Sequence, residues 1–216
     1  MSDKHLSSQF DSELNGVSSR VMELGGLVES QIRLATYALS QFSVDSANRE
    51  LSSIIARRQP TARDLRLLIA ISKTTANLER AGDEADKIAR MVKSIIGSGS
   101  ARALPSSDLR VAAELASGLL RKALDAFARL DTAVALSILK EDDQIDKEFD
   151  GFVRKLITYM MEDPRTISAS LDLLFVAKAI ERIGDHAKNI AEFIIYIVKG
   201  EDVRHTPMAQ IESAVR

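Results

Sequence analysis

The chain has 216 residues, with 29 Lys and Arg against 31 Asp and Glu, a formal charge of −2 and a pI near 6.0. This balance gives no net positive field for a phosphate backbone, so nucleic acid is not expected as the main partner. The absence of cysteine excludes disulfides, Cys-ligated zinc, iron–sulfur clusters and a cysteine nucleophile. The longest apolar run, 193–198, is too short to insert across a bilayer, and we expect a soluble, cytoplasmic protein.

Four prolines separate long segments of the chain, and in order they are Pro60, Pro105, Pro164 and Pro207. Proline inside a helix costs about 3 kcal/mol, so each is expected to mark a boundary. Between them, apolar residues recur with the 3.6-residue period of a helix. Gly97 and Gly200 are expected to end helices, and Asp163 to cap a helix whose first turn holds Pro164. The sequence thus predicts an all-α protein of about six long helices.

An internal repeat organises these helices. Segment 78–89 aligns with 180–191 at an offset of 102, with seven identities in twelve positions where chance gives about one. Further upstream, 32–47 aligns with 120–135 at an offset of 88. A duplication of three helices follows, which predicts two tandem, pseudo-symmetric three-helix bundles.

The bundles are expected to occupy residues 1–100 and 101–216, joined by the Gly- and Ser-containing linker 97–105. The two offsets differ by 14, so the first half lacks about 14 residues that the second half has, at a break near Arg49 and Glu50. The gap is either a real shortening of the chain or a segment missing from this sequence, and the sequence leaves both open.

Pairs of carboxylates stand out in the second half. Glu181 and Asp185 are spaced i, i+4, as are Asp142 and Asp146, so each pair projects from one face of a helix. The two pairs are mirror images about the turn at 163–164. If the two helices form an antiparallel hairpin there, all four carboxylates lie at the same height.

Such a set of hard oxygen ligands suits Mg²⁺, Mn²⁺ or Fe. In the first half, Glu79 and Asp83 form one wall of an equivalent site, which Asp86 could extend, while the opposite wall falls in the gap near Arg49. The predicted metal ligands are therefore Glu79, Asp83, Asp142, Asp146, Glu181 and Asp185.

Simpler interpretations stand beside the metal site. Acidic i, i+4 pairs also mark solvated helix faces, where basic residues such as Lys188 form surface ion pairs. Gly82 and Gly184 lie between Glu and Asp in both repeats, which indicates close approach of a neighbouring helix or a ligand. His186 could join a metal shell, although a solvated histidine is the simpler expectation.

The chain resembles the PhoU family, accessory regulators of bacterial high-affinity phosphate transport, over nearly its whole length. The residues that carry the resemblance are Arg57–Ala62 with Asp64–Arg66, both Glu-Arg-x-Gly-Asp segments, Leu124–Arg129, Thr158–Arg165 and Val203–His205. The family's Glu/Asp-x-x-x-Asp motif matches Glu79/Asp83, Asp142/Asp146 and Glu181/Asp185. Its usual fourth copy has no counterpart here, because the gap lies at that place.

The resemblance implies a cytoplasmic, non-enzymatic negative regulator of the phosphate-starvation response. It implies an adaptor between the ATPase subunit of the phosphate ABC transporter and a membrane sensor histidine kinase, often a homodimer, that binds divalent or iron-type metals (Mg, Mn, Fe or Zn) at its acidic motifs. Two alternatives remain at this point. One is a phosphate-ester hydrolase with carboxylate-bridged metals, and the other is a scaffold whose carboxylates are purely structural.

Overall fold

The computed structural model describes residues 44–58, 60–98, 105 and 107–215. Within these ranges the chain forms six α-helices and no strand, which confirms the all-α prediction. The helices are α2 (Val44–Arg58), α3 (Ala62–Gly97), α4 (Ser107–Arg129), α5 (Thr132–Glu162), α6 (Ile167–Lys199) and α7 (Met208–Val215), with a short 3-10 helix, η3 (Pro164–Thr166).

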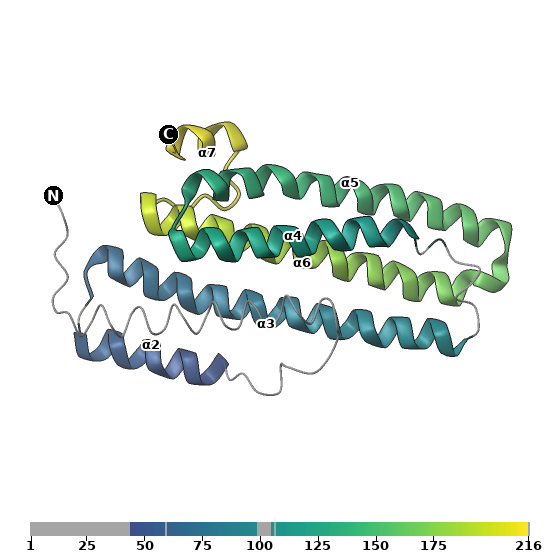
Figure 1. Cartoon of the computed structure of the whole chain (residues 1–216), viewed down its shortest axis with the longest axis horizontal. Coiled ribbons are helices and arrows are strands. Elements are labelled where there is room, and N and C mark those ends of the chain that lie inside the picture. Colours follow the sequence, from purple (N-terminus) through teal and green to yellow (C-terminus); the bar gives the residue numbers. More distant parts are fainter. Residues whose placement is uncertain (1–43, 59, 99–104, 106, 216) are drawn as a thin grey trace.

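Helices α3, α4, α5 and α6 lie side by side as an elongated bundle (Figure 1). Helix α6 is central, because α3, α4 and α5 all pack along it, while α2 packs on α3. Helices α3 and α6 are antiparallel: Arg66 Nε donates to the Ile197 carbonyl at one end, and Ser94 Oγ to Asp172 Oδ2 at the other. The short α7 folds back against α5 and α6.

The central position of α6 explains its apolar sequence. Ile190, Ile194, Ile195 and Ile197 are all 0% exposed, although they project from different sides of the helix. A helix that is apolar around most of its circumference is stable in water only when neighbours cover it on most sides. The hydrophobic core is accordingly continuous from α3 through α6 to α4 and α5.

The four prolines lie between the α-helices, as predicted, and Pro164 begins the short 3-10 helix η3. Asp163 caps the turn after α5 by accepting from the Arg165 backbone N–H at 3.1 Å, and Gly200 ends α6 in the left-handed conformation with φ 81°. Gly97 also ends a helix, as predicted, but without a left-handed cap. This glycine is the last residue of α3, and the cap that follows, Ser98, has an ordinary right-handed φ of −76°.

The repeat is visible in the helix bounds. Shifted by 102 residues, α3 covers 164–199, the range of η3 and α6 together. Helix α2 has 15 residues against 31 in α5, and it runs through Arg49 and Glu50 without a break. The helix expected before α2 lies outside the described residues, so the division into 1–100 and 101–216 stays a prediction.

Candidate metal centre

The hairpin of α5 and α6 brings four of the predicted ligands together. Glu181 and Asp185 lie on α6, and Asp142 and Asp146 lie on the facing side of α5. A Cβ atom built on Gly184, between the two α6 carboxylates, would be 3.4 Å from Asp142 Oδ1. The mirror relation about 163–164 therefore places the two pairs at the same height of the hairpin.

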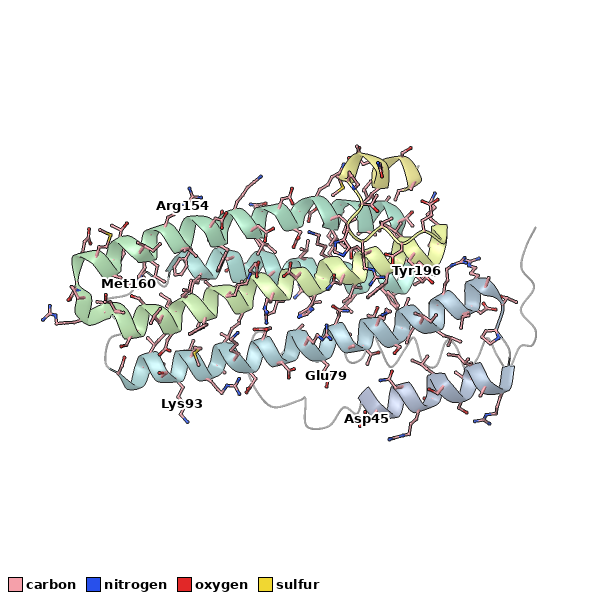
Figure 2. The ribbon with its side chains drawn as sticks, turned by 180° about the vertical axis from the view of Figure 1, so that it is seen from behind. Asp45, Glu79, Lys93, Arg154, Met160 and Tyr196 are labelled. Carbon is pink, nitrogen blue, oxygen red and sulfur yellow. The ribbon has the colours of Figure 1, made fainter. Side chains whose placement is uncertain are left out.

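The other predicted ligands lie on α3 and not on the hairpin that carries this carboxylate cluster of Asp142, Asp146, Glu181 and Asp185. Glu79 and Asp83 are exposed on α3, with Glu79 near the middle of the helix (Figure 2). Asp86 forms an ion pair with Arg90 of the same helix at 2.9 Å. Among the described residues, neither Glu79 nor Asp83 belongs to a group of three side chains that could hold a metal ion.

Two lysines enter the carboxylate cluster. Lys188 Nζ donates to Asp142 Oδ2 at 2.8 Å, and the Asp142 side chain is only 2% exposed. Lys178 Nζ donates to Glu181 Oε1 at 2.6 Å. The sequence indicated only a surface role for Lys188 and no role for Lys178. Each lysine lies three residues from a predicted ligand on α6, and residues at this spacing share a helix face.

Negative charge remains in excess in spite of the lysines. Burial, followed by the charges of Glu181, Asp142 and Asp146, raises the pKa of Asp185 to about 6, and Lys178 only partly offsets this. Glu181 Oε2 is buried and has no hydrogen-bond partner in the described part of the chain. A buried acceptor without a donor is costly, so one more positive charge beside Glu181 would stabilise the cluster.

These observations fit a hard cation by charge and donor type. In the described residues, however, no three Asp, Glu or His side chains are already placed to hold one metal ion. Lys188 forms an ion pair with Asp142, and the lysine would have to turn away before that carboxylate could act as a metal ligand. The metal site therefore stays a prediction.

Close approach at Gly184 is confirmed. A Cβ there would lie 2.8 Å from Ile145 Cδ1, closer than two non-bonded carbon atoms normally approach, and Ile145 itself is only 2% exposed. Glycine accordingly costs α6 some helix propensity but lets α5 pack against it at this height.

His186 faces the other side of α6, toward α3. Asn77 Nδ2 donates to the Lys73 carbonyl at 2.8 Å, which turns Asn77 Oδ1 toward Asn189 Nδ2 and His186 Nδ1, each 3.0 Å away. Since this oxygen can only accept, His186 Nδ1 must donate, which leaves Nε2 as the free ring nitrogen.

The environment of His186 keeps its ring neutral. Burial, and then the nearby charges of Arg80 and Arg182, lower the pKa of His186 to about 4, while Glu84 acts in the opposite direction. The expectation of a solvated histidine was wrong, because a histidine on the polar side of one helix becomes partly buried when α3 packs against it.

A cleft of about 950 Å³ opens beside this histidine, between α3, α5, α6 and the C-terminal segment that includes α7. Three arginines, Arg80, Arg182 and Arg204, line it together with acidic residues that include Asp83, Asp185 and Glu192. The sequence gave no indication of this cleft, because its walls come from helices about 100 residues apart.

Comparison with known proteins identifies the family. The family model described as the PhoU domain matches residues 44–92 and 109–194. A phosphate-specific transport system accessory protein PhoU homolog from Burkholderia sp is 48% identical over 229 residues, covering 98% of this chain and 97% of that protein. The chain belongs to the PhoU family.

Other PhoU proteins are similar over comparable lengths. Phosphate-specific transport system accessory protein PhoU of Escherichia coli (strain K12) is 45% identical, over 94% of this chain and 90% of that protein. The crystal structure of PhoU from Pseudomonas aeruginosa matches with a TM-score of 0.82 and 40% identity, over 89% of this chain and 100% of that one. The phosphate transport system regulatory protein PhoU from Streptococcus pneumoniae matches with a TM-score of 0.72 and 28% identity, over 90% and 99%.

This PhoU-family chain is shorter than its alignment with a relative. The alignment with the Burkholderia protein spans 229 positions, more than the 216 residues of this chain, so at least 13 positions have no counterpart here. The expected gap near Arg49 and Glu50 is of similar size, and its place stays a prediction.

None of the helices in the described ranges is long and apolar enough to span a membrane.

Proposed function

We propose that this chain is a cytoplasmic accessory protein of phosphate transport and a negative regulator of the phosphate-starvation response. The observation that carries this proposal is the 45–48% identity, over nearly the whole chain, to proteins named phosphate-specific transport system accessory proteins. Because such relatives are named as accessory or regulatory, we expect this chain to act by binding rather than by catalysis.

The regulation we propose is that of an adaptor between the ATPase subunit of the phosphate ABC transporter and a sensor histidine kinase. Long helices packed into one continuous core make a stiff body, and its exposed surface carries charged side chains of both signs. Charged surfaces of this kind select partners by complementarity more than by total area. We expect the adaptor to act as a homodimer.

Gene replacement in a bacterium that lacks its own PhoU tests this function. The chain should restore repression of a phosphate-starvation reporter when phosphate is plentiful, and tagged protein should retain both the transporter ATPase and the kinase. A strain that stays derepressed although the protein is folded and abundant would contradict the proposal.

We further propose that the carboxylate cluster binds a divalent or iron-type metal. Asp142, Asp146, Glu181 and Asp185 would hold it, and the metal would supply the positive charge that the cluster lacks. The partnerless Glu181 Oε2 and the raised pKa of Asp185 support this proposal. Glu79 and Asp83 remain predicted ligands of a separate site in the first half.

Calorimetric titration with Mn²⁺ and with Mg²⁺ tests the metal proposal. Glu181→Gln combined with Asp185→Asn should abolish binding, whereas Asp150→Asn, an exposed carboxylate on α5, should leave it unchanged. Equal binding by all three proteins would refute the site without touching the regulatory function. Hydrolysis of a generic phosphate ester that depends on the metal and on these carboxylates would favour an enzyme instead.

A further inference from the structure

The two Glu-Arg-x-Gly-Asp segments place one arginine each at the interface between α3 and α6. Arg80 and Arg182 are 102 residues apart, the offset of the repeat, and therefore occupy equivalent positions in the two halves. Arg182 Nη1 donates to Glu84 Oε1 across the interface at 3.0 Å, and the Glu84 side chain is only 11% exposed. One of the two arginines thus has a well-placed acidic partner.

The equivalent partner of the other arginine is not acidic. The same offset of 102 carries Glu84 onto His186, so the symmetric arrangement gives Arg80 an imidazole where Arg182 has a carboxylate. Arg80 has no ion-pair partner among the residues that the structure describes. The ion pair at this interface is therefore formed once, while its symmetry mate lacks the negative group.

The position at which Arg80 lacks an acidic partner opens to solvent. Arg80, Arg182 and His186 all line the cleft of about 950 Å³, which has room for a small ligand. Since His186 Nδ1 is held by Asn77, the ring can offer Nε2 to a ligand as a hydrogen-bond acceptor. Arg80 offers up to five N–H donors in a planar fork that matches an oxyanion.

The acidic residues of the cleft restrict the kind of anion that fits. Asp83, Asp185 and Glu192 also line the cleft and repel an anion that can only accept hydrogen bonds. An oxyanion that keeps a proton at neutral pH can instead donate from its own hydroxyl group, either to a carboxylate or to His186. Hydrogen phosphate has this property, whereas sulfate does not.

We propose that the cleft between α3, α5, α6 and the C-terminal segment binds inorganic hydrogen phosphate, with Arg80 contacting its negative oxygens and His186 Nε2 accepting from its hydroxyl. The anion takes the place that a carboxylate at position 186 would fill by symmetry with Glu84. His186 faces α3, but Asp185 of the carboxylate cluster and Lys188, the partner of Asp142, also line the cleft. The proposed contacts of Arg80 and His186 need neither a bound metal nor the adaptor role.

Titration of the metal-stripped full chain with inorganic phosphate at pH 7.5, by calorimetry or ³¹P NMR, tests the proposal. Phosphate should bind, and sulfate should bind at least about tenfold more weakly because a lost hydrogen bond to a charged group is worth about 1.5–3 kcal/mol. Glycerol phosphate, whose phosphoryl group carries little proton at this pH, should also bind at least about tenfold more weakly.

Variants assign the binding to the named residues. Arg80→Gln should weaken phosphate binding at least about tenfold, while Arg154→Gln, on the outer side of α5 away from α3 (Figure 2), should leave it unchanged. His186→Glu gives Arg80 the carboxylate that Arg182 already has, and it should abolish phosphate binding while the protein keeps its thermal midpoint within a few degrees.

Three results would overturn the proposal. The first is no phosphate binding by the wild-type chain, and the second is equal binding by wild type and Arg80→Gln. The third is binding of sulfate or glycerol phosphate as tight as that of phosphate, which would remove the argument from the hydroxyl donor. None of these results would affect repression of the reporter or metal binding, so failure of this site is distinguishable from failure of the proposed function.

Discussion

Lys188 on α6 donates to Asp142 on α5 at 2.8 Å, and this ion pair lies inside the carboxylate cluster. The Asp142 side chain is 2% exposed and that of Lys188 is 35% exposed. If Lys188 is removed, the buried carboxylate of Asp142 keeps its full desolvation cost. If Asp142 is removed, the partly exposed lysine can turn to water. The two members of the pair are therefore expected to respond very differently to substitution.

Lys188→Met should destabilise the protein by about 2–3 kcal/mol, less than the about 3–5 kcal/mol of a fully buried pair, because Lys188 is partly solvated. Urea unfolding of the metal-free protein measures this. Lys147→Met, at an exposed position on α5, should change stability by less than about 0.5 kcal/mol. In an Asp142→Asn background the effect of Lys188→Met should nearly vanish, and an unchanged effect there would show that the ion pair is not its cause.

Gly184→Ala should destabilise the protein by about 1–2 kcal/mol, because the new Cβ meets Ile145 Cδ1 at 2.8 Å. Gly151→Ala is the matched control on α5, since nothing lies within 4 Å of its Cβ position, and it should stabilise by up to about 1 kcal/mol. In an Ile145→Val background, which removes Cδ1, Gly184→Ala should cost much less. Equal costs in both backgrounds would place the constraint elsewhere.

Asp185 and His186 should give opposite contributions to the pH dependence of stability. The pKa of Asp185 is raised from 3.8 to about 6, so its favourable contribution is complete below pH 3.8 and is lost as the pH rises through 6. The pKa of His186 is lowered from 6.5 to about 4, so its contribution is complete above pH 6.5 and is lost as the pH falls through 4. Between pH 4 and 6 the two trends oppose each other.

Asp185→Asn removes one of these trends. In the metal-free variant, the free energy of unfolding should fall more steeply than in wild type as the pH is lowered from 6.5 to 4, because only the His186 contribution remains. His186→Gln should have the opposite effect on the slope. Urea midpoints at pH 4, 5, 6 and 7 measure both, and parallel curves for wild type and the Asn variant would contradict the expected shift at Asp185.

Gly200→Ala should destabilise α6 by about 1 kcal/mol or more, since φ is 81° there and a side chain is strained in the left-handed region. For a chain of this size, about 1 kcal/mol lowers the thermal midpoint by about 2–4 °C. Gly97→Ala at the end of α3 is the natural comparison, because it has open space and no positive φ, and it should be neutral or stabilising. A similar loss at both positions would argue against backbone strain as the cause.

Much of the site could be read from the sequence because it depends on one hairpin. Equal spacing about the turn at 163–164 placed Asp142 opposite Asp185, since residues equally far from an antiparallel turn lie at the same height. The glycine between the α6 carboxylates likewise predicted close contact, which the structure shows with Ile145. Both inferences rest on short-range geometry that helical periodicity fixes.

The sequence by itself determined the helical class, the proline boundaries and the repeat offset of 102, because these follow from local propensity and self-comparison. Only the tertiary structure decided that Lys188 meets Asp142, that Asn77 holds His186, and that Arg182 rather than Arg80 obtains an acidic partner. These contacts depend on how each helix is rotated about its axis against a neighbour. That rotation is set by packing of the whole core, which no local segment of the chain encodes.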